Sequence, residues 1–301
     1  MPRVVAETQK TKIPFEANAW KTLKLPEYPG ITQIDLLVKL NISTDATNGG
    51  TPAADAPWSI LKNIQIVKGG KYPIQATGWL LHVKNYYEHG GYIRADSLPT
   101  AAGATADVYF ELVIHPGYYP ERKDDLTVGI NAADEETYLQ VLWGDASDLG
   151  TGYTINSGEI VVTVWHVPGA KPRSLPAWEI TEKTIDQTYS DLSLYVDLPV
   201  NKLIHKAVID IRDSSGARSD SVVTEIGLVK TVPQKTELHR ISYDAQKNDD
   251  RRRYRVDPLT GEIVFDMLEV GYLDIKGVDW LKLAFSTGAT GKLNILWVAR
   301  V

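Results

Sequence analysis

An internal duplication constrains this chain more than any other feature of its sequence. Residues 58–91 read WSILKNIQIVKGGKYPIQATGWLLHVKNYYEHGG, and residues 221–249 read SVVTEIGLVKTVPQKTELHRISYDAQKND. Each segment holds an apolar strand, a turn, a second strand and a helix-like polar stretch, so the second half of the chain repeats the structural pattern of the first. The alignment matches Ile60 with Val222, Ile64 with Ile226, Leu81 with Leu238, and His82 with His239.

The repeat covers most of the chain, which indicates two tandem copies of one whole domain. The offset between the copies shrinks along the chain, so the first copy has the longer loops, where insertions are best tolerated. The matched segments are 31–42 with 203–211, 107–114 with 262–269, 138–143 with 280–285, and 159–165 with 292–297. Trp165 and Trp297 end matching strands, and we expect both to fill the core.

The pattern predicts an all-β protein made of two tandem eight-stranded antiparallel jelly rolls with short helices in loops. We place an arm at residues 1–13, the first roll at 14–167, a proline-rich linker at 168–177 and the second roll at 178–301. Helices are expected over 77–89 and 243–253. Strands are expected at 15–25, 31–42, 60–67, 72–76, 107–114, 126–130, 138–143 and 159–167, then at 192–196, 203–211, 222–229, 236–241, 262–268, 272–275, 280–285 and 292–299.

The arm contains three basic residues and few apolar ones. Arg3, Lys10 and Lys12 are candidates for contact with a membrane or a neighbouring subunit. Because the arm has little apolar surface to bury, we expect it to be ordered only by such a contact.

The amino-acid composition further limits the classes of protein to which this chain could belong. The 301 residues are 43% hydrophobic, include no cysteine and carry a formal net charge of −6, which argues against a protein built mainly to hold nucleic acid. The longest apolar runs are far shorter than a membrane span, and the first residues are too polar for a signal peptide.

The sequence predicts no catalytic, cofactor or metal site. The six histidines lie outside metal-binding spacings, and no serine-hydrolase or nucleotide-binding motif is present. Acidic pairs such as Asp124-Asp125 and Asp249-Asp250 are interpreted as solvated surface charge. One dense basic run remains, formed by Arg251, Arg252, Arg253 and Arg255. It is either an inter-subunit or anionic contact, or a solvated loop balanced by Asp249, Asp250 and Asp257; we favour the balanced loop.

The tandem pattern resembles the double jelly-roll major capsid proteins of tailless icosahedral viruses that have an internal membrane. The resemblance rests on ILKNIQIVKGGKYPIQ with its helix at 77–89, and on VVTEIGLVK with its partner segment. It implies a structural protein of the virion capsid that forms homotrimers of pseudo-hexameric outline, which tile a shell. The implied partners are neighbouring capsomers, minor capsid or penton proteins and an internal lipid membrane, with no specific nucleic acid. The longer loops of the first copy would then form the outer turrets.

The sequence leaves two other classes of protein open. One is a carbohydrate- or receptor-binding β-sandwich protein, such as a viral spike. The other is an enzyme similar to peptide N-glycanases, which place two eight-stranded rolls side by side with an acidic site between them. Those enzymes are usually secreted and contain disulfides, whereas this chain has no cysteine.

Overall fold

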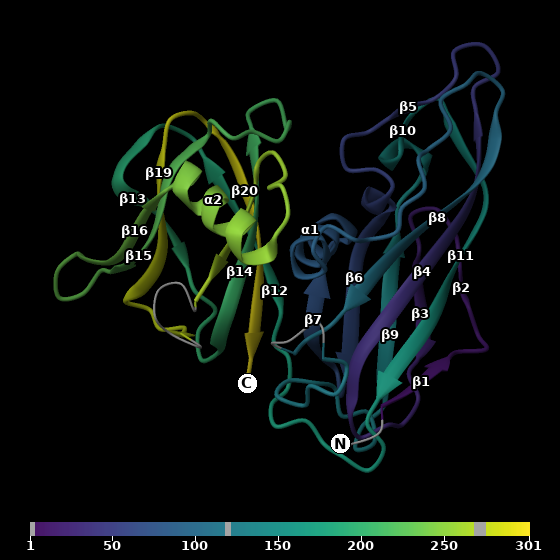
Figure 1. Cartoon of the computed structure of the whole chain (residues 1–301), viewed down its shortest axis with the longest axis horizontal. Coiled ribbons are helices and arrows are strands. Elements are labelled where there is room, and N and C mark those ends of the chain that lie inside the picture. The colour runs from purple at the N-terminus through teal and green to yellow at the C-terminus, as the bar shows by residue number, and fades with distance from the viewer. Residues whose placement is uncertain (1–3, 118–121, 268–274) are drawn as a thin grey trace. The chain divides into compact units, whose positions relative to one another are not determined.

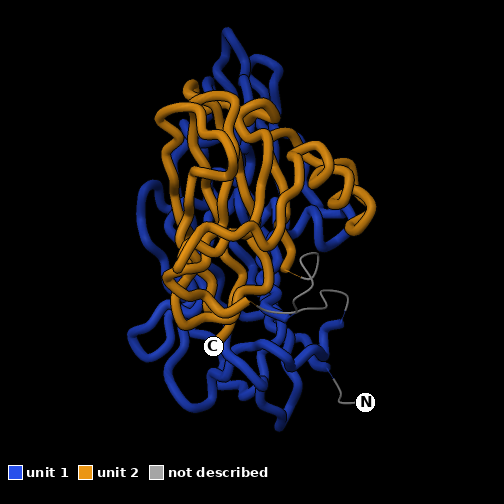
Figure 2. Tube along the Cα trace, turned by 90° about the vertical axis from the view of Figure 1, so that its left-hand side faces the viewer, with its two compact units in different colours: residues 1–176 blue, residues 177–301 orange. Residues whose placement is uncertain are grey.

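The computed structural model describes residues 4–117, 122–267 and 275–301, and antiparallel strands dominate them (Figure 1). The chain divides into two compact units, residues 1–176 and 177–301 (Figure 2).

The first unit consists of two principal sheets. One has the order β1–β11–β4–β8 and the other β3–β9–β6–β7. The strands of the first sheet are β1 (Val5–Thr8), β11 (Tyr153–His166), β4 (Ile31–Thr44) and β8 (Thr105–Ile114); those of the second are β3 (Trp20–Lys24), β9 (Thr137–Trp143), β6 (Leu61–Lys68) and β7 (Lys71–Ala76). Short β2 (Ile13–Pro14) also pairs with β11, and β5 (Thr51–Pro52) pairs with β10 (Gly150–Thr151).

The second unit repeats this topology strand for strand. Its sheets have the orders β12–β20–β14–β17 and β13–β19–β15–β16. The strands are β12 (Glu179–Ile185), β20 (Gly291–Arg300), β14 (Leu203–Asp213) and β17 (Glu262–Asp266), then β13 (Tyr189–Asp197), β19 (Leu281–Thr287), β15 (Val223–Lys230) and β16 (Thr236–Ser242), with β18 (Ile275–Lys276) beside β14. The identical order confirms the duplication, and the predicted pair of eight-stranded jelly rolls is confirmed with it.

Alternate residues of each strand form the core between the sheets. In β4, the side chains of Ile34, Leu36 and Val38 are fully buried, while the residues between them are partly exposed. This is the two-residue period of a strand with one face inside. In the second unit the core includes Ile209, Phe265 and Trp297.

The two predicted helices are present. Helix α1 (Gly78–Glu88) follows β7, and α2 (Tyr243–Tyr254) follows β16. Each begins at a hydroxyl N-cap: Thr77 accepts from Leu80 N, and Ser242 accepts from Ala245 N. Two short 3-10 turns, Trp58–Ile60 and Ala146–Asp148, complete the helical elements of the described residues.

The equivalence of His82 and His239 is wrong. His82 lies inside α1, whereas His239 lies in β16, before α2 begins. The hairpin between β15 and β16 has a longer connection than the Gly69-Gly70 turn between β6 and β7, so the true match beyond the hairpin pairs Thr77 with Ser242.

The set of eight strands in each roll differs from the prediction at one position. The expected strand at 126–130 forms only isolated bridges through Val128 and Ile130, and most of the expected strand at 272–275 lies outside the described residues. Strands β1 and β12 complete the two sets instead, each at a sheet edge. β1 is short and β12 is mostly polar. An edge strand pairs with a neighbour on one side only and much of its surface is exposed, so its side chains need not alternate between apolar and polar.

The two tryptophans that end matching strands face opposite ways. Trp297 is 0% exposed in the core of the second unit, as expected. Trp165 lies at an outward position of β11, between buried Val164 and His166, so the expectation of a second core tryptophan is wrong. Successive side chains of a strand point to opposite faces of the sheet. If the register of a strand differs between the two copies by an odd number of residues, a matched side chain therefore moves to the other face.

Candidate functional site

Residues 4–13 belong to the first jelly roll. Strand β1 pairs with β11, with Val5 opposite His166, and Gln9 N donates to Val162 O at 2.8 Å. Ile13 is 1% exposed in β2. The expectation that the arm is ordered only by an external contact is therefore wrong for these residues. The edge of β11 offers backbone N–H and C=O groups to the arm, and hydrogen bonds to these groups order it although it buries little apolar surface.

The basic residues of the arm lie beside this edge. Lys12 Nζ is 2.6 Å from Glu159 Oε1, and the Lys12 side chain remains 50% exposed. Lys10 is exposed, and Arg3 lies outside the described residues. Exposed ion pairs of this kind contribute about 0–1 kcal/mol, so Lys12 is available to exchange its partner.

The arginine run forms the last turn of α2, and three of its members have aspartate partners. Arg251, Arg252 and Arg253 pair with Asp257, Asp249 and Asp266, at 3.3, 2.5 and 3.0 Å. Arg255 is exposed and ends the helix in the left-handed conformation, with φ of 58°. Arg252 is the most exposed of the paired arginines, at 80%.

Two aspartates that were interpreted as solvated charges are buried. Asp250 is 0% exposed, and its Oδ2 accepts from Val264 N at 2.9 Å. Asp125 is 5% exposed and accepts from Thr127 N at 2.9 Å. Each of these carboxylates accepts a hydrogen bond from a backbone N–H group, so both serve local structure.

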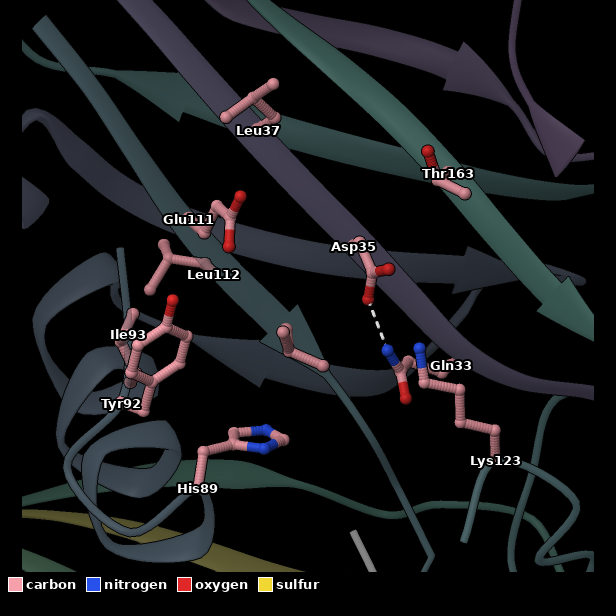
Figure 3. Close-up of a pocket in the computed structure, with 11 residues that line it drawn as sticks. Gln33, Asp35, Leu37, His89, Tyr92, Ile93, Glu111, Leu112, Lys123 and Thr163 are labelled. Atoms are coloured by element: carbon pink, nitrogen blue, oxygen red, sulfur yellow. Dashed lines mark hydrogen bonds between the residues drawn. The ribbon is translucent and has the colours of Figure 1, made fainter. Parts of the chain in front are cut away.

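A groove of about 500 Å³ lies on the outward face of the β11–β4–β8 sheet (Figure 3). The sheet contributes Asp35, Thr163 and Glu111, while the segment that follows α1 contributes His89 and Tyr92. Tyr92 is 89% exposed. We call this feature the β4 groove.

Asp35 is the best-anchored polar group of the β4 groove. Its carboxylate accepts from Gln33 Nε2 and from Trp165 Nε1, both at 2.5 Å. Lys123 Nζ stands 3.3 Å from the centre of the Trp165 ring, a cation–π arrangement. Burial lowers the pKa of His89. The opposite charges of Asp35 and Lys123 thus lie beside the apolar and aromatic surface of the β4 groove.

Sequence reasoning missed the β4 groove. Its only local signal is the alternation in β4, where Asp35, Leu37 and Lys39 interrupt a row of buried aliphatic residues. That alternation marks an outward face, but the segment after α1 that forms the other wall is remote in sequence.

The described ranges contain no cluster of three or more histidine, aspartate or glutamate side chains arranged to hold a metal ion. Within the same ranges, neither helix is long and apolar enough to cross a membrane.

Comparisons with known proteins identify the fold. No family model matches the sequence, and no curated protein matches it. The crystal structure of the STIV MCP matches with a TM-score of 0.86 at 17% identity, covering 99% of this chain and 97% of that one. The chain has the double jelly-roll fold of viral major capsid proteins.

Two further solved structures have the same fold. The atomic structure of Sulfolobus turreted icosahedral virus includes a chain with a TM-score of 0.84 at 17% identity, covering 99% of this chain and 90% of that one. The major capsid protein of bacteriophage PM2 has a TM-score of 0.62 at 15% identity, covering 98% and 96%. At these sequence identities the similarity shows the fold alone. The arrangement of strands is shared, whereas most residue types differ.

Proposed function

We propose that this protein is the major capsid protein of an icosahedral virus and acts as a structural subunit with no catalytic role. The observation that carries the proposal is the TM-score of 0.86 to the STIV MCP over 99% of the chain. Because a fold hosts many functions, the surfaces described above must also suit assembly.

The assembly unit is a homotrimer. Two rolls of identical topology in each chain give a trimer six similar lobes, which produces a pseudo-hexameric outline. Closed rotational symmetry lets identical contacts repeat around such a ring. Neighbouring trimers would then tile the shell, with minor capsid or penton proteins filling its special positions.

The arm is a secondary contact. Strand β1 fixes the arm along β11, and Lys10 and Lys12 lie exposed beside it, with Arg3 preceding them. An anionic membrane or an acidic neighbouring capsomer would attract these charges, with about 1 kcal/mol for each near a lipid surface. Arg252 and Arg255 on α2 are weaker candidates for the same kind of contact, because their neighbours Asp249 and Asp257 offset the local charge.

Native mass spectrometry of the purified protein tests the trimer, and electron microscopy of assembled particles tests the shell. We expect a trimer at micromolar concentration and a closed lattice of pseudo-hexameric capsomers. A protein that stays monomeric at that concentration and never forms shells would overturn the proposal.

A further inference from the structure

Two polar atoms in the wall of the β4 groove lack the hydrogen bonds that buried groups normally make. Gln33 is 4% exposed, and its Nε2 donates to Asp35, but its Oε1 has no partner among the described residues. The Nε2 atom of His89 is also buried and has no hydrogen-bond partner within the same ranges. Because most buried polar groups are hydrogen-bonded, two such atoms in one groove indicate that a molecule bound there supplies the missing partners.

These two atoms come from opposite walls of the β4 groove. Gln33 lies in β4 and His89 follows α1, and Figure 3 shows the His89 ring extending toward Gln33. Burial lowers the pKa of His89, so its imidazole is neutral near pH 7 and has one N–H donor and one nitrogen acceptor. The Oε1 atom of Gln33 only accepts. A ligand that satisfies both atoms therefore donates at least one hydrogen bond.

The charged side chains of the β4 groove disfavour a ligand with a net charge. Asp35 and Glu111 present carboxylates, which repel an anion. Lys123 extends its ammonium group toward Asp35, where it repels a cation (Figure 3). Hydrogen bonds, both donated and accepted, thus remain the main polar means by which the groove recognises a ligand.

An exposed tyrosine adds a flat apolar surface beside these polar groups. Tyr92 is 89% exposed and follows Gly90 and Gly91, which turn the chain with φ of 65° and 79°. Its ring lies on the same wall as His89 (Figure 3). The groove volume of about 500 Å³ is within the range of sites for small organic molecules.

We propose that the β4 groove binds a neutral carbohydrate, either a monosaccharide or the terminal sugar of a glycan. Each sugar hydroxyl donates one hydrogen bond and accepts two, so neighbouring hydroxyls donate to Gln33 Oε1 and Glu111 and accept from Lys123. The C–H face of the sugar ring packs against the Tyr92 ring. This binding activity goes beyond the structural role in a shell, and neither depends on the other.

NMR titrations of the purified protein with glucose, galactose and mannose test the proposal through saturation transfer to the sugar. A ligand of this size binds with a Kd on the order of 1–10 mM, so each sugar is added to about 50 mM. We expect at least one of the three to bind. The uronic acid of that sugar should bind about threefold more weakly or worse, because Asp35 and Glu111 repel its carboxylate.

Two variants and a control assign the binding to the β4 groove. Tyr92→Ala removes the aromatic ring and Glu111→Gln removes a charged acceptor, and each should weaken binding about fivefold. Glu111→Gln should also reduce the discrimination against the uronic acid. Tyr72→Ala removes a ring that is 53% exposed on β7, in the other sheet, and should leave the Kd unchanged within about twofold. Circular dichroism establishes that each variant is folded.

Three results would overturn the inference and leave the capsid role unaffected. One is the absence of binding by all three sugars at about 50 mM. Another is binding that neither Tyr92→Ala nor Glu111→Gln weakens, which would place the sugar elsewhere on the protein. The third is tighter binding of lysine amide than of any neutral sugar, which would assign the β4 groove to a cationic ligand.

Discussion

Asn85 in α1 and Asp250 in α2 occupy one position of the duplicated fold, each eight residues after the N-cap of its helix. Asn85 Nδ2 donates to Val113 O, and Val113 N donates to Asn85 Oδ1, both at 2.7 Å. Val264 N donates to Asp250 Oδ2 at 2.9 Å. Val113 and Val264 lie in the last strands of equivalent sheets, so each helix satisfies backbone groups on a strand that would otherwise be open to aberrant pairing.

Replacing Asn85 should therefore destabilise the first roll. Asn85→Ala removes a fully buried side chain and leaves the part-buried N–H and C=O of Val113 without these partners, and each such group costs about 1–3 kcal/mol when buried. We expect the free energy of unfolding in urea to fall by about 2–4 kcal/mol. Asn156→Ala is the matched control, because Asn156 makes its hydrogen bonds at the surface; a surface change should stay within about 0.5 kcal/mol. Equal losses for the two variants would contradict the docking role.

The sequence predicted the parts of the fold that bury apolar rows. Ile64 and Ile226 lie where the repeat placed them, in β6 and β15, and both are fully buried. The edge strands β1 and β12 could not be predicted in this way, because neither carries a row of apolar residues. Hydrogen bonds to the neighbouring strands β11 and β20 order them instead. The β4 groove was also beyond prediction, since Asp35 and Tyr92 meet only through the tertiary fold.

The two tryptophans should differ strongly in their contribution to stability. Trp297→Ala removes a fully buried ring from the second-roll core and should lower the free energy of unfolding by about 3–5 kcal/mol. Trp165→Ala removes an outward-facing ring held by Asp35 and should have a smaller effect, within about 2 kcal/mol. Urea denaturation of both variants measures the difference. A larger loss for Trp165→Ala would mean that its outward position has been assigned wrongly.

His115 should make the protein less stable in mild acid. Burial, with the nearby Lys84 ammonium adding to it, lowers the pKa of His115 to about 4. Between pH 6.5 and 4 the unfolded chain takes up a proton at this residue that the native chain does not, so the free energy of unfolding falls as the pH falls through this window.

The contribution of His115 is measured as the difference between the wild type and His115→Gln at each pH. That difference should change by about 3 kcal/mol between about pH 7 and pH 4, since one pKa unit corresponds to about 1.36 kcal/mol. His239→Gln is the comparison, because burial also lowers the pKa of His239 but its side chain is only partly buried. A parallel pH dependence for the wild type and His115→Gln would show that His115 titrates normally.

Removing the arm should affect the shell more than the trimer. Deletion of residues 2–12 takes away β1 and its pairing with β11, together with three basic residues, but leaves the buried aliphatic cores of both rolls in place. We expect the truncated protein to form trimers, as measured by native mass spectrometry, and to lose shell assembly or binding to anionic vesicles.

A second variant separates the strand from its charges. Arg3→Ser with Lys10→Ser and Lys12→Ser keeps the β1 backbone, while it removes the basic residues. If charge carries the contact, this variant should bind anionic vesicles several-fold more weakly for each charge removed, and added salt should weaken the wild type in the same way. If the strand carries it, the substituted protein should assemble normally and only the deletion should fail. A truncated protein that assembles normally into membrane-containing particles would exclude both roles for the arm.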